Sequence, residues 1–135
     1  MLFFVLTLSP GTAHAAGRCP QWEARIRKAG LPVKDFSYIA YRESRCSVTA
    51  INARYDKHGN VIWTLNKNGS IDRGLFQINS IHKQTVYRVC KGGLHRLLTI
   101  DCNLKVAKYL YDSSGLSPWR GQSVVVKPKT TLPPP

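Results

Sequence analysis

FSYIAYRESR, residues 36–45, is the stretch of this chain that decides its fold. Its apolar residues recur at helical spacing, so the stretch predicts a helix from Phe36 to about Arg45 with one buried side. Asp35 stands directly before this helix and is expected to be its N-cap, because a short carboxylate accepts hydrogen bonds from the first free N–H groups. A helix of this kind needs an apolar surface to pack against, and 43% of the 135 residues are hydrophobic. We therefore expect one globular domain with a helical core.

Glu43 is the unusual residue of this helix, because it lies on the same side as Phe36, Ile39 and Ala40. At about 100° per residue, Glu43 is within about 20° of Phe36, whereas Arg42 and Arg45 are expected to point away from this side. Partial burial disfavours the charged form of a carboxyl group, and that property suits a general acid near neutral pH. The alternative is a glutamate that reaches solvent from a helix end.

The rest of the chain predicts further helices and one small sheet. Turn clusters rich in Asn and Gly, at 56–60 and 66–69, flank a segment of strand composition, which indicates a two- or three-stranded antiparallel sheet. Residues 74–79 are apolar but too few for their periodicity to assign a structure. The predicted fold is α+β and mainly α, with the sheet inserted between helices. The expected segments are helices at Gln21–Ala29, Ile81–Cys90 and Asp101–Asp112 and a strand at Val61–Leu65.

The two ends of the chain differ from this domain. Residues 1–16 combine an apolar run with Ala13-His14-Ala15, the small-x-small pattern of a cleavage site, and so predict a signal peptide. This segment has no Lys or Arg before its apolar run, and the alternative is a buried N-terminal segment. We expect a domain over residues 17–122 and a Pro-rich flexible tail over residues 123–135.

Four cysteines, Cys19, Cys46, Cys90 and Cys102, agree with export. None forms a C-x-x-C pair, which argues against a zinc or redox motif. Of the three possible pairings we favour Cys90–Cys102, which closes a short loop, together with Cys19–Cys46, which ties the N-terminus to a helix. In a reducing compartment the same residues would be buried thiols. The four histidines have no ligand spacing, so we expect no metal and no cofactor.

The net charge of +13 predicts an anionic partner, which the charge alone leaves open among nucleic acid, anionic lipid and bacterial wall. An export signal favours the wall and places the protein in the periplasm, the cell wall or the extracellular space.

A second stretch, GSIDRGLFQINS at residues 69–80, narrows this choice. Together with Glu43-Ser44 and Ala50-Ile51-Asn52, it resembles the lysozyme superfamily. It is most similar to the small lytic transglycosylases that accompany bacterial secretion and conjugation systems. The late segment Asn103–Tyr111 fits the same pattern, so the resemblance covers residues 20–120. It implies a lysozyme-like fold and a monomeric enzyme that cleaves peptidoglycan, with a secretion or conjugation apparatus as a partner.

The resemblance also implies roles for individual residues. Glu43 matches the acid that protonates the glycosidic oxygen, and Gln77 and Asn79 match positions that line the sugar cleft, where an amide can bind an N-acetyl group. Trp119 corresponds to a tryptophan placed against the acid in lysozymes, or it is a core residue. Ser44 either supports the glutamate or ends the helix. Tyr109 and Trp63 would stack on sugar rings, with core packing as the favoured alternative for both. The candidate substrate-binding residues are therefore Ser44, Gln77, Asn79, Tyr109 and Trp119.

Asp72 determines which reaction is expected. It occupies the position of the second carboxylate of animal lysozymes, which favours hydrolysis through two carboxylates. The transglycosylases often carry an acid there too, although their reaction needs only one glutamate and yields an anhydro sugar. A third interpretation is that Asp72 caps a turn. We favour the transglycosylase, and keep a hydrolytic lysozyme, a non-catalytic wall-binding module and a nucleic-acid binder as alternatives.

Overall fold

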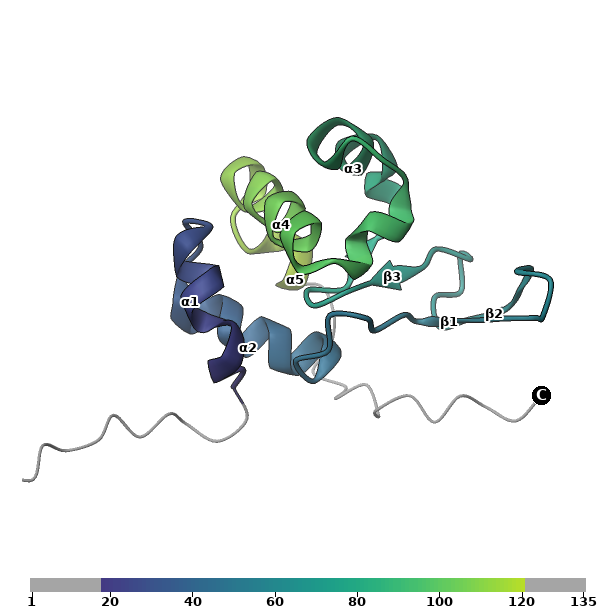
Figure 1. The fold of residues 1–135 in the computed structure, drawn as a ribbon, viewed down its shortest axis with the longest axis horizontal. Coiled ribbons are helices and arrows are strands. Elements are labelled where there is room, and N and C mark those ends of the chain that lie inside the picture. The colour runs from purple at the N-terminus through teal and green to yellow at the C-terminus, as the bar shows by residue number, and fades with distance from the viewer. Residues whose placement is uncertain (1–17, 121–135) are drawn as a thin grey trace, which may run out of the picture.

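The computed structural model describes residues 18–120, which form an α+β fold that is mainly helical (Figure 1). Helices α1 and α2 precede two short pairs of strands, and three further α-helices follow them. The predicted signal peptide and the predicted tail from residue 123 lie outside the described residues. The elements are α1 (Pro20–Lys28), α2 (Val33–Ser44), β1 (Ala53–Tyr55), β2 (Val61–Thr64), β3 (Asp72–Arg73), β4 (Ile78–Asn79), η1 (Ser80–His82), α3 (Lys83–Cys90), η2 (Leu94–Leu98), α4 (Ile100–Ser114) and α5 (Ser117–Arg120).

Helix α2 begins earlier than its sequence predicted. Its N-cap is Pro32, and the Phe36 N–H donates to the Pro32 carbonyl at 3.0 Å. The prediction that Asp35 is the N-cap is therefore wrong. Proline fixes its own φ near the helical value and lacks an N–H that would need a partner, so it can precede a helix without a capping side chain. Asp35 lies instead in the first turn, where its charge complements the positive end of the helix dipole.

The core is built around Phe36, which is fully buried. Its ring makes edge-to-face contacts with the rings of Phe76, Tyr111 and Trp119, at centroid distances of 5.3, 5.5 and 5.1 Å. These partners come from the turn between β3 and β4, from α4 and from α5. One aromatic residue of α2 thus joins three segments that are far apart in the sequence, as the predicted buried side of this helix requires.

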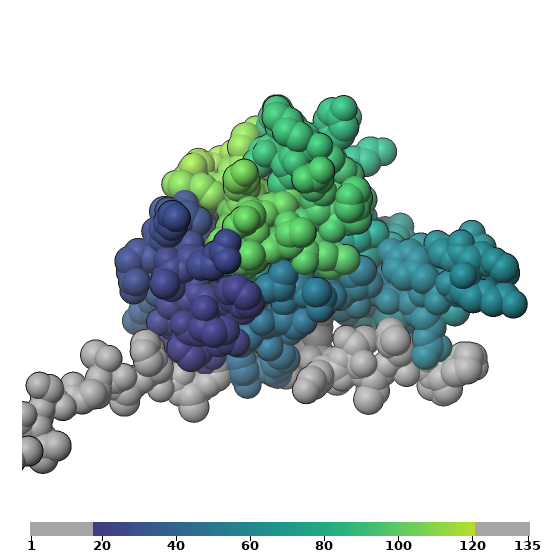
Figure 2. All heavy atoms as spheres, viewed as in Figure 1, coloured from purple at the N-terminus to yellow at the C-terminus, as the bar shows by residue number. Residues whose placement is uncertain are grey.

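The predicted sheet is present as an antiparallel pair, β1 with β2, in which Arg54 lies opposite Trp63. A second antiparallel pair, β3 with β4, places Asp72 opposite Asn79, and an isolated bridge between Ile51 and Arg73 links the two pairs. The β1–β2 hairpin extends away from the helices (Figures 1 and 2).

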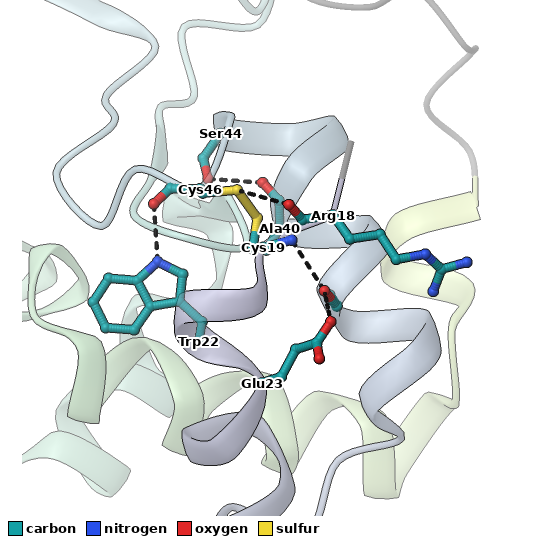
Figure 3. The surroundings of a disulfide bond; sticks show 8 residues. Arg18, Cys19, Trp22, Glu23, Ala40, Ser44 and Cys46 are labelled. Carbon is teal, nitrogen blue, oxygen red and sulfur yellow. Dashed lines mark hydrogen bonds between the residues drawn. A yellow bond between two sulfur atoms is a disulfide. The ribbon is translucent and has the colours of Figure 1, made fainter. Parts of the chain in front are cut away.

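Two disulfides, Cys19–Cys46 and Cys90–Cys102, confirm the favoured pairing. The first joins the residue before α1 to the residues that follow α2 (Figure 3). Beside it, the Trp22 indole N–H donates to the Cys46 carbonyl at 3.0 Å. The carboxyl-terminal end of α2 is therefore held covalently and by a side chain of α1. Among residues 18–120, no helix is long and apolar enough to cross a membrane.

Candidate active site

Glu43 lies in the last turn of α2, and its side chain is only 3% exposed. The helix ends directly after it, because Arg45 and Cys46 both adopt left-handed backbone conformations, with φ of 54° and 66°. The Ser44 hydroxyl donates to the Ala40 carbonyl at 2.9 Å, so this side chain bonds to its own helix. The predicted burial of Glu43 is confirmed, and the hydrogen bond of Ser44 fits a role at the helix end.

Arg42 pairs with Glu43, contrary to the prediction that its side chain points away. Its Nε and Nη2 groups donate to Glu43 Oε1 at 3.0 and 2.8 Å. Helical spacing fixes where a side chain leaves the backbone, but the long arginine side chain folds back toward its neighbour. The Nη2 group also donates to the Trp119 carbonyl at 2.7 Å. One guanidinium group therefore links the candidate acid to α5.

Trp119 is buried beside this link, in α5. Its indole N–H donates to the Phe76 carbonyl at 3.0 Å, and its ring packs against Phe36. Its backbone carbonyl accepts from Arg42. Trp119 is therefore a core residue that is connected to Glu43 through Arg42.

Asp72 stands in β3 and is 1% exposed. Three asparagine amides donate to its carboxylate: Asn79 to Oδ1 at 2.8 Å, Asn66 to Oδ2 at 3.0 Å and Asn52 to Oδ2 at 3.4 Å. Both carboxylate oxygens thus accept hydrogen bonds. These three donors fix the orientation of the Asp72 carboxylate.

Asn79 belongs to this network. Besides its bond to Asp72, its side-chain amide donates to the Ser70 hydroxyl at 2.9 Å, and its carbonyl oxygen accepts from the Ile81 N–H at 2.9 Å. The side chain thus holds the carboxylate and caps the turn that follows β4.

Gln77 has a strained backbone, with φ of 50°, a value that non-glycine residues rarely adopt. Its amide N–H groups donate to the carbonyls of Ala50 and Gly74 at 3.1 and 3.0 Å. Its side-chain oxygen is buried and has no hydrogen-bond partner among the described residues. Strain and an unsatisfied buried acceptor are features that concentrate at functional sites.

The segment that follows α2 connects the surroundings of Glu43 to those of Asp72. The Gly74 N–H donates to the Ala50 carbonyl at 2.7 Å, and the Asn52 N–H donates to the Asp72 carbonyl at 3.1 Å. On the other side, the fully buried Asn103 of α4 accepts from the Phe76 N–H and donates to the carbonyls of Arg73 and Leu97. The turn that carries Gln77 is therefore fixed from both sides.

Tyr109 lies apart from these residues. It is an exposed residue of α4, and the Arg88 guanidinium lies over its ring at 4.8 Å from the centroid. It lines a separate groove between α1 and α4, which contains none of the other predicted site residues. Trp63 is half-buried in β2.

Sequence reasoning did not identify Asn66 and Arg42 as parts of the site. Asn66 belongs to a turn cluster, and a turn composition does not specify which carboxylate its amide will meet. The proximity of Arg42 to Glu43 in sequence was the available signal, since a long cation next to a buried acid can fold over it.

A family model described as a lysozyme-like domain matches residues 27–121. This match covers more than half of the chain, so the chain belongs to the lysozyme-like domain family. No curated protein and no solved structure matches it. The family indicates a glycosidase that acts on peptidoglycan, and the two disulfides agree with a protein that works outside the cytoplasm.

Proposed function

We propose that the protein is a lytic transglycosylase that cleaves the β-1,4 bond between N-acetylmuramic acid and N-acetylglucosamine. The protonated Glu43 gives its proton to the glycosidic oxygen as the bond to C1 breaks. The resulting carboxylate then takes the proton of the muramic acid's 6-hydroxyl, whose oxygen bonds to C1. The products are a 1,6-anhydro-N-acetylmuramic acid end and an N-acetylglucosamine end with a free 4-hydroxyl group, and no water is consumed.

The observation that carries the proposal is the placement of Glu43 in a lysozyme-like domain. A carboxyl group with 3% exposure at a helix end has little access to water, and this property suits proton transfer within a closed site. Arg42 holds Oε1 through two N–H groups. A planar guanidinium restricts the orientation of a carboxylate, and its charge stabilises the anion that remains after the first proton transfer.

The surroundings of Asp72 support a reaction with one carboxylate. A nucleophilic carboxylate must direct one oxygen at C1, but both oxygens of Asp72 already accept hydrogen bonds from asparagine amides. We therefore assign Asp72 a structural role at the centre of this network. Its carboxylate ties Asn66, in the loop before β3, to Asn79 in β4.

Gln77 is the proposed contact for an acetamido group. Its amide N–H groups are engaged by two backbone carbonyls, which fixes the orientation of the side chain and leaves its oxygen as the acceptor. The N–H of an N-acetyl group is a donor of matching chemistry. In this interpretation the groups that cover this buried oxygen move when the sugar binds, and the sugar then satisfies an acceptor that has no partner among the described residues.

A hydrolytic lysozyme is the second candidate, and the asparagine network also favours it in one respect. Three amide donors hold the Asp72 carboxylate in one orientation, and a retaining glycosidase needs a second carboxylate that is held in place. The two candidates then differ in what Asp72 does during the reaction.

Digestion of purified peptidoglycan separates them. We expect the mature protein to release muropeptides that are lighter by one water at muramic acid, and Glu43→Gln to release none. Asp72→Asn keeps the shape of the side chain. We expect this variant still to form anhydro products, although its folded state should be less stable. Reducing-end products that disappear in Asp72→Asn would instead identify a lysozyme. Binding of glycan by both wild type and Glu43→Gln, with no release by either, would identify a non-catalytic wall-binding module.

We also propose export through a signal peptide at residues 1–16 and a role beside a secretion or conjugation apparatus. N-terminal sequencing of the exported protein tests the first part, and a start near Gly17 is the expected result. The resemblance of its motifs to transglycosylases of those systems supports the second part.

A further inference from the structure

A groove of about 620 Å³ lies between α1 and α4, and Val89 of α3 also lines it. Figure 1 shows the positions of the three helices. Its floor is formed by apolar groups of Ala29, Val89, Leu104 and the Tyr109 ring. The Lys108 side chain packs close to Gly30 at the end of α1, where a Cβ added to the glycine would lie 3.2 Å from Lys108 Cε. None of Glu43, Asp72 and Gln77 lines this groove, so its occupant is not the sugar at the scissile bond.

The charges of the groove define the chemistry of its occupant. Two carboxylates line it, but Asp101 is paired with Arg25 and Asp112 with Lys108, the latter at 2.7 Å. The remaining cations, Lys28 and Lys105, form no ion pair within residues 18–120. A ligand with two carboxylates and small apolar groups would therefore match both the rim and the floor.

We propose that this groove binds the acidic stem peptide of peptidoglycan, at a site separate from the glycan-cleaving centre. The inference rests on the proposed function only in its choice of ligand. Stem peptides carry free carboxylates from D-glutamate and diaminopimelate, beside alanine methyl groups. The volume of the groove is in the range of sites for small ligands. The carboxylates bind Lys28 and Lys105, and the methyl groups pack on the apolar floor.

This assignment gives the positive charge of the chain a defined use. A glycan strand presents peptides at regular intervals, so a domain that grips one peptide while it cleaves elsewhere binds the wall at two points. Two linked contacts strengthen binding without any new interaction at the cleavage site, through the higher effective concentration of the second.

The test is an NMR titration of the full chain carrying Glu43→Gln with the free tetrapeptide L-alanyl-γ-D-glutamyl-diaminopimelyl-D-alanine. We expect chemical-shift changes at Ala29, Lys105 and Tyr109. Lys28→Glu/Lys105→Glu should weaken binding about tenfold or more, because it replaces two attractions by two repulsions. The matched control is Lys57→Glu/Lys67→Glu, which makes the same change of charge at exposed positions outside the groove. It should leave the affinity within about twofold, and circular dichroism confirms that each variant is folded.

The first three outcomes below would overturn the groove assignment, and the fourth would overturn only the proposed function. Equal losses in the two double variants would mean a general attraction of charge. Equal binding of an all-L peptide of glutamate and leucine would assign the groove to an acidic segment of a protein partner. Cleavage of sacculi by wild type without binding of the tetrapeptide would refute the groove alone. Binding of the tetrapeptide by a protein that cleaves no sacculi would refute the proposed function and leave the groove assignment in place.

Discussion

Gly74→Ala is expected to be one of the most destabilising small substitutions in this chain. Gly74 follows β3 with φ of +78°, and an added Cβ would lie 2.1 Å from the Leu97 carbonyl oxygen and 2.2 Å from Asn103 Nδ2. Real Cβ contacts are never this close, so the backbone of Leu97 or the Asn103 amide must move. Asn103 makes three hydrogen bonds that fix the turn around Gln77. The substitution therefore affects the stability of the domain and the geometry of the site together.

The cost can be divided into two parts. The left-handed backbone alone costs an L-residue about 1–2 kcal/mol. Displacement of Asn103 leaves buried polar groups unpaired, at about 1–3 kcal/mol each. With two such groups at about 1–3 kcal/mol each and the backbone term of about 1–2 kcal/mol, the loss in the free energy of unfolding is about 3–8 kcal/mol in total, a large part of the stability of a typical domain.

Gly69→Ala is the matched control. Gly69 has nearly the same φ, +77°, but an added Cβ would meet nothing within 4 Å. It should lose only the backbone term of about 1–2 kcal/mol. Urea unfolding followed by tryptophan fluorescence gives both free energies. In thermal unfolding, the melting temperatures of the two variants should differ by about 8 °C or more. If Gly74→Ala lost no more than about 1 kcal/mol beyond Gly69→Ala, the close approach of Asn103 and Leu97 would be refuted.

Three further predictions concern stability. Arg42→Ala should cost about 3 kcal/mol in urea unfolding, because it removes the two N–H groups that Arg42 donates to the buried Glu43. Glu43→Gln in the same chain should restore most of this, and an equal loss in the double variant would contradict the pairing. Burial lowers the pKa of His82 below 6.5, so the folded state favours the neutral imidazole. The contribution of His82 to the free energy of unfolding is therefore complete above about pH 6.5 and is lost as the pH falls from there through the pKa of the folded state. His82→Gln should therefore flatten the decline of the melting temperature between about pH 7 and pH 5, and an unchanged decline would assign it to other groups. Replacement of Cys19 and Cys46 by alanine should cost about 3.5 kcal/mol for a loop with a sequence separation of 27, and calorimetry showing no loss would mean that the disulfide does not stabilise the fold.

The sequence predicted the helices and the buried side of α2 because both depend on local periodicity. Phe36 and Glu43 are buried as their spacing required. The N-cap was misplaced because proline can begin a helix without a capping side chain, so Asp35 was a plausible but incorrect choice. Periodicity places the base of a side chain and not its tip, which is why the pairing of Arg42 with Glu43 was missed.

The surroundings of Asp72 were beyond prediction for a different reason. The amide of Asn52 comes from 20 residues away in the sequence, and a turn-forming asparagine in a sequence pattern does not indicate its partner. The disulfides were constrained by only three possible pairings, so a simple argument about loop length was sufficient. Tyr109 was considered for sugar stacking because aromatic residues serve that purpose, but its position beside α1 follows from tertiary packing.

The bond from Arg42 to the Trp119 carbonyl has a mechanical consequence. Helix α5 is one turn long and comprises only Ser117–Arg120. A shift of this short helix acts on the carboxylate of Glu43 through the Arg42 guanidinium group, in addition to its contacts with the core through the Trp119 ring. The position of the candidate acid is therefore mechanically coupled to the position of α5.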